Sequence, residues 1–160
     1  MAGIDLDLQH KKRIGIIGGN SPDITSLKNA ERLGELIAKN GYILVNGGMK
    51  GVMEASARGA KSANGFIIAI TPGKSIGEAN PISDIVITTG LGYMRNPLVV
   101  LNSDILVAID GSYGTLSEIA YAKIYNRIVY GLNTWDIQGV ISLATPEDVI
   151  HEINNFFKQQ

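Results

Sequence analysis

Residues 105–118 read Ile-Leu-Val-Ala-Ile-Asp-Gly-Ser-Tyr-Gly-Thr-Leu-Ser-Glu, and this segment indicates the fold class of the chain. The apolar run from Ile105 to Ile109 is typical of a strand that is buried on both faces of a parallel sheet. A glycine-bearing turn follows it, and helical spacing then continues to about Tyr125. A strand, a short turn and a helix make one βα unit, which indicates the α/β class.

The same unit recurs on both sides of this stretch. Strands are expected at residues 13–17, 42–45, 66–70, 84–87 and 128–130, with an edge strand at 140–143; helices are expected at about 24–40, 52–62, 93–102 and from Thr145 onward. Ser21 and Asp23 are both candidates for the cap of the first helix, and Thr145-Pro146 is typical of a cap with a first-turn proline. This alternation predicts a single Rossmann-like, doubly wound parallel sheet of six to seven strands with helices on both faces.

The composition limits the classes of protein that this chain can represent. We expect residues 1–12 to form an N-terminal tail and residues 13–160 to form one nucleotide- or phosphate-binding domain with one core. The 160 residues contain no cysteine, which excludes disulfides and thiolate chemistry and fits a reducing cytoplasm. The apolar runs are too short for a membrane span, and the first residues do not resemble a secretory signal. We therefore expect a soluble, cytoplasmic protein.

The charged residues and histidines argue against two further classes of function. His10 and His151 are the only histidines, and both lie outside the glycine-rich segments, so no metal site or histidine general base is expected. The formal net charge is −1, and the cluster Lys11-Lys12-Arg13 is too short to supply a basic field for nucleic acid. A small ligand is the expected partner.

Three of the turns between a strand and a helix are rich in glycine: residues 18–19, 47–51 and 111–114. Parallel strands bring such turns to one edge of the sheet, where backbone N–H groups and helix N-termini bind phosphate. Their spacing matches neither the dinucleotide fingerprint nor the P-loop, and Asn46 stands where a dinucleotide site needs an acid. The turns therefore predict a phosphate-bearing, nucleotide-like ligand.

Two of these segments resemble the motifs of the LOG superfamily. Residues 111–118 resemble Gly-Gly-x-Gly-Thr-x-x-Glu, with Ser112 in place of the second glycine. Residues 46–54 resemble Gly-Gly-Gly-x-x-Gly-Leu-Met, with Asn46 in place of the first glycine. Residues 92–96 resemble the arginine-bearing segment between them. The Arg95-Asn96 pair and the short chain point to the molybdenum-cofactor-carrier-like branch.

The resemblance implies a set of ligand-binding residues in this chain. They come from the glycine-rich turns and the arginine segment: Gly18, Gly19, Asn20, Ser21, Gly47, Gly48, Arg95, Asn96, Gly111, Ser112, Tyr113, Gly114 and Thr115. Tyr93 and Tyr113 are candidates for stacking on a heterocycle. Met53 is interpreted as a core residue. Family members dimerise through helices near the second motif, so a homo-oligomer, a dimer or a tetramer, is implied.

The resemblance leaves two functions open. One is a binding or carrier protein for a phosphorylated nucleotide-like ligand, as in the molybdenum cofactor carriers, with the cofactor or a nucleoside monophosphate as ligand and no required cofactor. The alternative is a ribonucleoside 5′-monophosphate phosphoribohydrolase, in which Arg95 and Glu118 would be catalytic. A lysine decarboxylase is disfavoured, because no lysine has the context of a pyridoxal phosphate site. Asp110 and Ser112 depart from the motif of the hydrolytic members and favour binding without efficient turnover.

Overall fold

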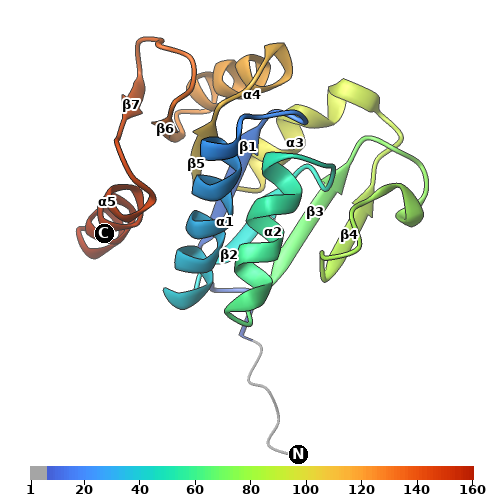
Figure 1. Cartoon of the computed structure of the whole chain (residues 1–160), viewed down its shortest axis with the longest axis horizontal. Coiled ribbons are helices and arrows are strands. Elements are labelled where there is room, and N and C mark those ends of the chain that lie inside the picture. The colour runs from blue at the N-terminus through green and yellow to red at the C-terminus, as the bar shows by residue number, and fades with distance from the viewer. Residues whose placement is uncertain (1–6) are drawn as a thin grey trace, which may run out of the picture.

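A computed structural model describes residues 7–160, and its core is one seven-stranded sheet in which every pairing is parallel (Figure 1). The strand order is β4-β3-β2-β1-β5-β6-β7. The strands are β1 (Arg13–Gly18), β2 (Ile43–Asn46), β3 (Ile67–Thr71), β4 (Ile85–Thr88), β5 (Ile105–Ile109), β6 (Ile128–Leu132) and β7 (Val140–Ser142). The doubly wound parallel sheet expected from the sequence is confirmed. The first six residues of the expected tail lie outside the described residues.

Five α-helices connect the strands and cover the two faces of the sheet. They are α1 (Ile24–Lys39), α2 (Val52–Ser62), α3 (Asn96–Leu101), α4 (Tyr113–Ile124) and α5 (Pro146–Lys158), with short 3-10 turns η1 (Ile76–Glu78) and η2 (Gly92–Arg95). The expected helix at 93–102 is therefore two elements: α3 begins at Asn96, and Pro97 in its first turn has no N–H to continue the hydrogen bonds of η2. In the described part of the chain, no helix combines the length and the apolar character that a bilayer crossing requires.

Two apolar layers hold the helices to the sheet. Ile14 and Ile16 of β1 point to the layer under α1, α2 and α5, while Ile17 points to the layer under α3 and α4. Successive strand residues face opposite sides, so a run of isoleucines fills both layers at once. β5 is buried along its whole length between them. The sheet is consequently a rigid base for the loops at its carboxyl edge.

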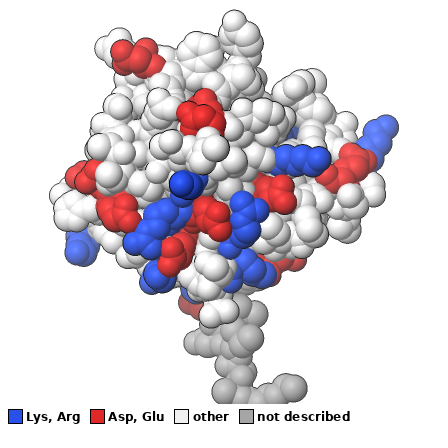
Figure 2. Space-filling model, viewed as in Figure 1, with Lys and Arg blue, Asp and Glu red and all other residues white. Residues whose placement is uncertain are grey.

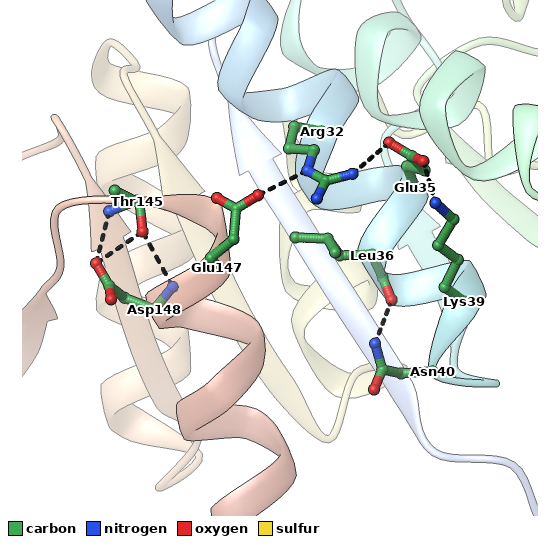
Figure 3. A network of polar contacts seen from close by, with 8 residues as sticks. All are labelled: Arg32, Glu35, Leu36, Lys39, Asn40, Thr145, Glu147 and Asp148. Carbon is green, nitrogen blue, oxygen red and sulfur yellow. Dashed lines mark hydrogen bonds and ion pairs between the residues drawn. The ribbon is translucent and has the colours of Figure 1, made fainter.

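Polar contacts fix α5 against α1 (Figure 3). Arg32 Nε donates to Glu147 at 2.7 Å, and its Nη1 donates to Glu35 at 2.8 Å. Thr145 and Asp148 form a reciprocal capping box, which confirms the cap expected from the sequence. At α1, Asp23 rather than Ser21 is the cap, because its carboxylate accepts from Ser26 N at 2.7 Å.

The surface over these helices carries charges of both signs. Figure 2 shows Lys and Arg interleaved with Asp and Glu across the lower half of the face drawn, and few charged side chains above it. Arg58 of α2 and Glu31 of α1 form an ion pair, with Nε 3.4 Å from Oε1. This face therefore has no extended field of one sign.

Candidate functional site

A cavity of about 430 Å³ lies at the carboxyl ends of β1 and β5. These strands are neighbours in the sheet, with Gly18 paired to Ile109. The strand that follows β1 in the chain, β2, lies on one side of this pair, and the strand that follows β5, β6, lies on the other side. Such a switch point separates the two following turns and leaves a crevice, where open α/β sheets bind ligands. The first and third glycine-rich turns therefore meet in one site.

The start of α4 supplies hydrogen-bond donors to this cavity. Ser112 is the N-cap, but its side chain accepts no bond from the helix. The first N–H groups of a helix have no intrahelical acceptor, and the helix dipole adds roughly half a positive charge there. Gly111 has φ +115, and a Cβ there would lie 2.5 Å from Thr115, so this turn needs glycine. The uncapped amides beside the cavity suit an anionic group.

Arg95 is held by carbonyl groups at the ends of two strands. Its Nη1 donates to Gly47 O at 2.6 Å and to Ile70 O at 2.5 Å, and its side chain is only 7% exposed. Its Nη2 donates to no acceptor within residues 7–160, although Arg95 lines the cavity. A Cβ on Gly47 would lie 2.6 Å from Arg95 Nη1, so the close approach depends on that glycine. The guanidinium is thus fixed through Nη1, and its Nη2 can donate hydrogen bonds to a ligand.

Asn96 connects Arg95 to α4. Its Oδ1 accepts from Arg95 Nε at 2.9 Å, and its Nδ2 donates to Ser117 Oγ at 3.0 Å. The Ser117 hydroxyl in turn donates to Gly114 O at 2.6 Å. This chain of bonds sets the guanidinium relative to the first turn of α4.

Glu118 lies one turn into α4 and lines the same cavity. Its carboxyl makes no hydrogen bond within the described residues, and it is 7% exposed. Burial raises the pKa of Glu118 to about 8, although the charge of Arg95 opposes part of that rise. Burial also lowers the pKa of Arg95, which the charge of Glu118 counteracts. At neutral pH the cavity therefore holds a charged guanidinium and a mostly neutral carboxyl group, which can donate a hydrogen bond.

Two exposed aromatic rings line the mouth of the cavity. Tyr93 is 80% exposed and Tyr113 is 79% exposed. Tyr113 packs against Trp135, with ring centroids 5.9 Å apart, and Trp135 Nε1 donates to Ser112 O at 3.2 Å. An aromatic rim above polar groups suits a ligand with a planar ring and a charged end.

Most of the residues predicted for the site meet in this cavity. Those that line it are Gly18, Gly19, Asn20, Gly47, Arg95, Asn96, Ser112, Tyr113, Gly114, Thr115 and Glu118. Their roles in ligand binding stay predictions. Asp110, which departs from the motif of the hydrolytic members, has a left-handed backbone with φ +51 and does not line the cavity.

Three predicted site residues lie elsewhere. Gly48 N donates to Asn46 Oδ1 and its carbonyl accepts from Asn80 N, so this buried glycine is used inside the loop. Ser21 is exposed and lies beyond the part of the first turn that lines the cavity. Gly111 shapes the turn by packing on Thr115 without lining the cavity.

The cavity also has a lining that the predicted set omitted. It consists of Ile16, Ile17, Met53 and Ser117, whereas Tyr93, which also lines the cavity, is a predicted stacking candidate. Met53, a predicted core residue, is 7% exposed, so it is packed in the core and is also part of the cavity wall. Ser117 lies three residues after Gly114, a helical spacing that places both on one face of α4. That spacing is the sequence signal from which Ser117 could have been predicted as a lining residue.

The chain belongs to the SLOG cluster4 family, whose pattern it matches over residues 11–156. It is 44% identical over 140 residues to an uncharacterized protein of Archaeoglobus fulgidus, covering 87% of this chain and 92% of that one. The fold is similar to a molybdenum cofactor binding protein from Rippkaea orientalis, with TM-score 0.88, 38% identity, and 92% and 98% of the two chains covered. The molybdenum cofactor carrier protein of Chlamydomonas reinhardtii is also similar, with TM-score 0.86 and 33% identity; the match covers 92% of this chain and 99% of that one.

The chain is also more distantly similar to a protein that is named as an enzyme. A probable cytokinin riboside 5′-monophosphate phosphoribohydrolase of Oryza sativa is 25% identical over 159 residues, and the match spans 88% of this chain and 61% of that protein. Together these findings confirm the LOG-superfamily assignment and its molybdenum-cofactor-carrier-like branch.

Proposed function

We propose that this protein binds and carries a phosphorylated, nucleotide-like heterocycle, in the manner of the molybdenum cofactor carriers. The observation that supports this most directly is the pairing of Arg95, fixed by Gly47 O and Ile70 O, with the uncapped first turn of α4 across one cavity. A phosphate would accept from both, because each offers donors without an acceptor and each is positive. The ring of the ligand would then lie toward Tyr93 and Tyr113 at the mouth.

The protonation state of Glu118 favours binding over turnover. A carboxylate is needed to steady an oxocarbenium-like centre or to activate water. With the pKa of Glu118 raised to about 8, the group is mostly protonated at neutral pH, and a phosphate beside it would disfavour ionisation further. A neutral carboxyl group can instead donate a hydrogen bond to a ring nitrogen or carbonyl.

The alternative function is a ribonucleoside 5′-monophosphate phosphoribohydrolase. It is favoured by one specific observation: Arg95 and Glu118 line the same cavity, and hydrolysis needs both a cation for the phosphate and a carboxylate for the sugar centre. The name of the rice relative agrees with this chemistry. In that mechanism Arg95 would hold the phosphate, and Glu118 would lie beside the N-glycosidic bond.

A turnover assay separates the two functions. Purified protein is incubated with each common nucleoside 5′-monophosphate, and free base and ribose 5-phosphate are quantified by chromatography. For a carrier, calorimetry should show binding of a nucleotide or a pterin phosphate, and chromatography should show no released base. Turnover at about 1 per second or faster, lost in Glu118→Gln, would overturn the carrier proposal and establish the hydrolase. Mass spectrometry of the ligand released from protein purified under mild conditions identifies the heterocycle.

We also infer that the protein works in the cytoplasm as a homo-oligomer, a dimer or a tetramer. The support is the apolar end of α4, where Ile124 is 66% and Tyr125 is 40% exposed. Light scattering of the intact protein tests this proposal, with Ile124→Glu expected to shift the mass toward that of the monomer. A monomeric wild-type protein would contradict it.

A further inference from the structure

A second cavity, of about 350 Å³, lies at the opposite end of the sheet from the first. Its wall combines the segment before β1, the segment before β5 and the residue before β6: Gln9, His10, Lys11, Lys12, Arg13, Leu101, Asn102, Ser103, Asp104 and Arg127. β1 has six residues and separates the two cavities by roughly 20 Å at 3.3 Å per residue. The second cavity is therefore a separate place in the fold.

Positive charge is concentrated in this wall. Lys11, Lys12, Arg13 and Arg127 line it, and none of them forms an ion pair within residues 7–160. The one carboxylate in the wall, Asp104, accepts from Arg13 N at 2.8 Å. Because the whole chain has a formal net charge of −1, four unpaired cations around one cavity stand out from the rest of the surface.

Arg127 gives independent support for a ligand here. Its Nε is buried and has no hydrogen-bond partner in the described part of the chain. Buried donors in folded proteins have an acceptor with few exceptions, and a guanidinium binds oxyanions through two parallel N–H bonds. The backbone of Arg127 is fixed, since its N–H donates to Ala122 O at 2.8 Å.

Two neighbouring cations are also positioned. Arg13 Nη1 lies 3.4 Å from Asn102 Oδ1, and Lys12 Nζ lies 5.3 Å from the centroid of the Phe157 ring. These contacts direct the two side chains without neutralising them. The cavity volume is within the range of small-molecule sites.

We infer that this cavity is a second site, which binds the oxyanion of a multiply charged small molecule such as a diphosphate. Lys11 and Arg127 hold the anion, with Arg13 and Lys12 on either side. The inference does not depend on the carrier function, because no residue of the first cavity contributes to it.

The test is a titration of ¹⁵N-labelled full-length protein with sodium pyrophosphate, followed by NMR, with sodium chloride at matched ionic strength in parallel. Pyrophosphate is expected to shift the amide signals of residues 11–13, 104 and 127. The variant Lys11→Gln/Arg127→Gln should bind about tenfold or more weakly at these signals. The control Lys28→Gln/Arg58→Gln removes two exposed charges from α1 and α2 and should bind like the wild type.

Each other outcome overturns the inference. Shifts confined to residues 111–115 would show that pyrophosphate binds only the first cavity. Equal shifts with sodium chloride would show general screening. Equal losses in both double variants would show a dependence on net charge alone. Shifts with a hexaglutamate peptide but not with pyrophosphate would assign the cavity to an acidic protein segment instead. Circular dichroism confirms that each variant is folded.

Discussion

The side-chain amide of Asn96 donates a hydrogen bond to Ser117, with Nδ2 3.0 Å from Oγ, and thereby joins the residue after Arg95 to the residue before Glu118. The other end of the same side chain accepts from Arg95 Nε. One amide thus links the segment that carries the Arg95 guanidinium to the helix that carries the Glu118 carboxyl group. The Arg-Asn pair in the sequence has a structural reason: the asparagine positions the arginine.

Replacing Asn96 by alanine should weaken ligand binding without unfolding the protein. Arg95 Nε loses its acceptor, and the link to α4 is lost, so the guanidinium can rotate away from the phosphate position. Calorimetry with the tightest-binding nucleoside 5′-monophosphate should show about a tenfold lower affinity, the cost of one hydrogen bond to a charged group. Asn154→Ala on α5 is the matched control and should bind normally. Unchanged affinity in Asn96→Ala would remove Asn96 from the binding site.

Gly114 offers a graded test of the phosphate position. A Cβ at this position would meet only Asn96 Nδ2 and a Tyr93 ring carbon, both at 3.9 Å, which is ordinary contact. Gly114→Ala should therefore keep its fold and much of its affinity, whereas Gly114→Leu should fill the cavity beside the first turn of α4 and abolish binding in calorimetry. If both variants bind as well as the wild type, the anion does not lie at this turn.

Sequence periodicity predicted the sheet well because its signal is local. β5 is a five-residue apolar run, and the structure buries every residue of it between two helix layers. Element ends were less predictable: β6 continues to Leu132, two residues beyond the expected strand, since its backbone pairs with β5 up to Ile109. That extension depends on a neighbouring strand, which a local pattern does not contain.

The site was predictable in part for the same reason. Motifs predicted Arg95, Thr115 and Glu118, which line one cavity although Arg95 comes from a different segment than the other two. Gly48 was indistinguishable from Gly47 in sequence, yet one glycine faces Arg95 and the other faces β3. Only the direction of the backbone after β2 decides between them. The second cavity could not be predicted, because Arg127 is far in the sequence from the cluster Lys11-Lys12-Arg13 and the two together form no motif.

Asn46 should contribute to stability rather than to binding. It is fully buried, its Nδ2 donates to Met53 O at 3.0 Å, and its Oδ1 accepts from Gly48 N at 2.8 Å. Asn46→Ala leaves the buried Gly48 N without an acceptor, whereas Met53 O still accepts from Ser56 Oγ at 2.9 Å, so urea unfolding should show a loss of about 1–3 kcal/mol. Asn40→Ala, at an exposed position, should cost less. A loss below about 0.5 kcal/mol would show that the loop after β2 does not need this side chain.

The buried carboxyl group of Glu118 should make the ligand-free protein less stable as pH rises. Its pKa is about 8 in the folded state against an ordinary value of 4.5, so between these values the folded chain holds a proton that the unfolded chain has released. Stability is then lost at up to about 1.4 kcal/mol per pH unit through this window and levels off above about pH 8. Glu35 and Glu147 have lowered pKa values, so their contributions to stability are already fully present at the acid end of this window and do not change across it.

Glu118→Gln keeps the shape of the side chain and removes the titration. Urea unfolding of both proteins from about pH 5.5 to about pH 7.5 should give a falling curve for the wild type and a flatter one for the variant. Parallel curves would mean that Glu118 is ionised in the folded protein, which would return it to the role of a carboxylate beside the reacting bond and favour the hydrolase.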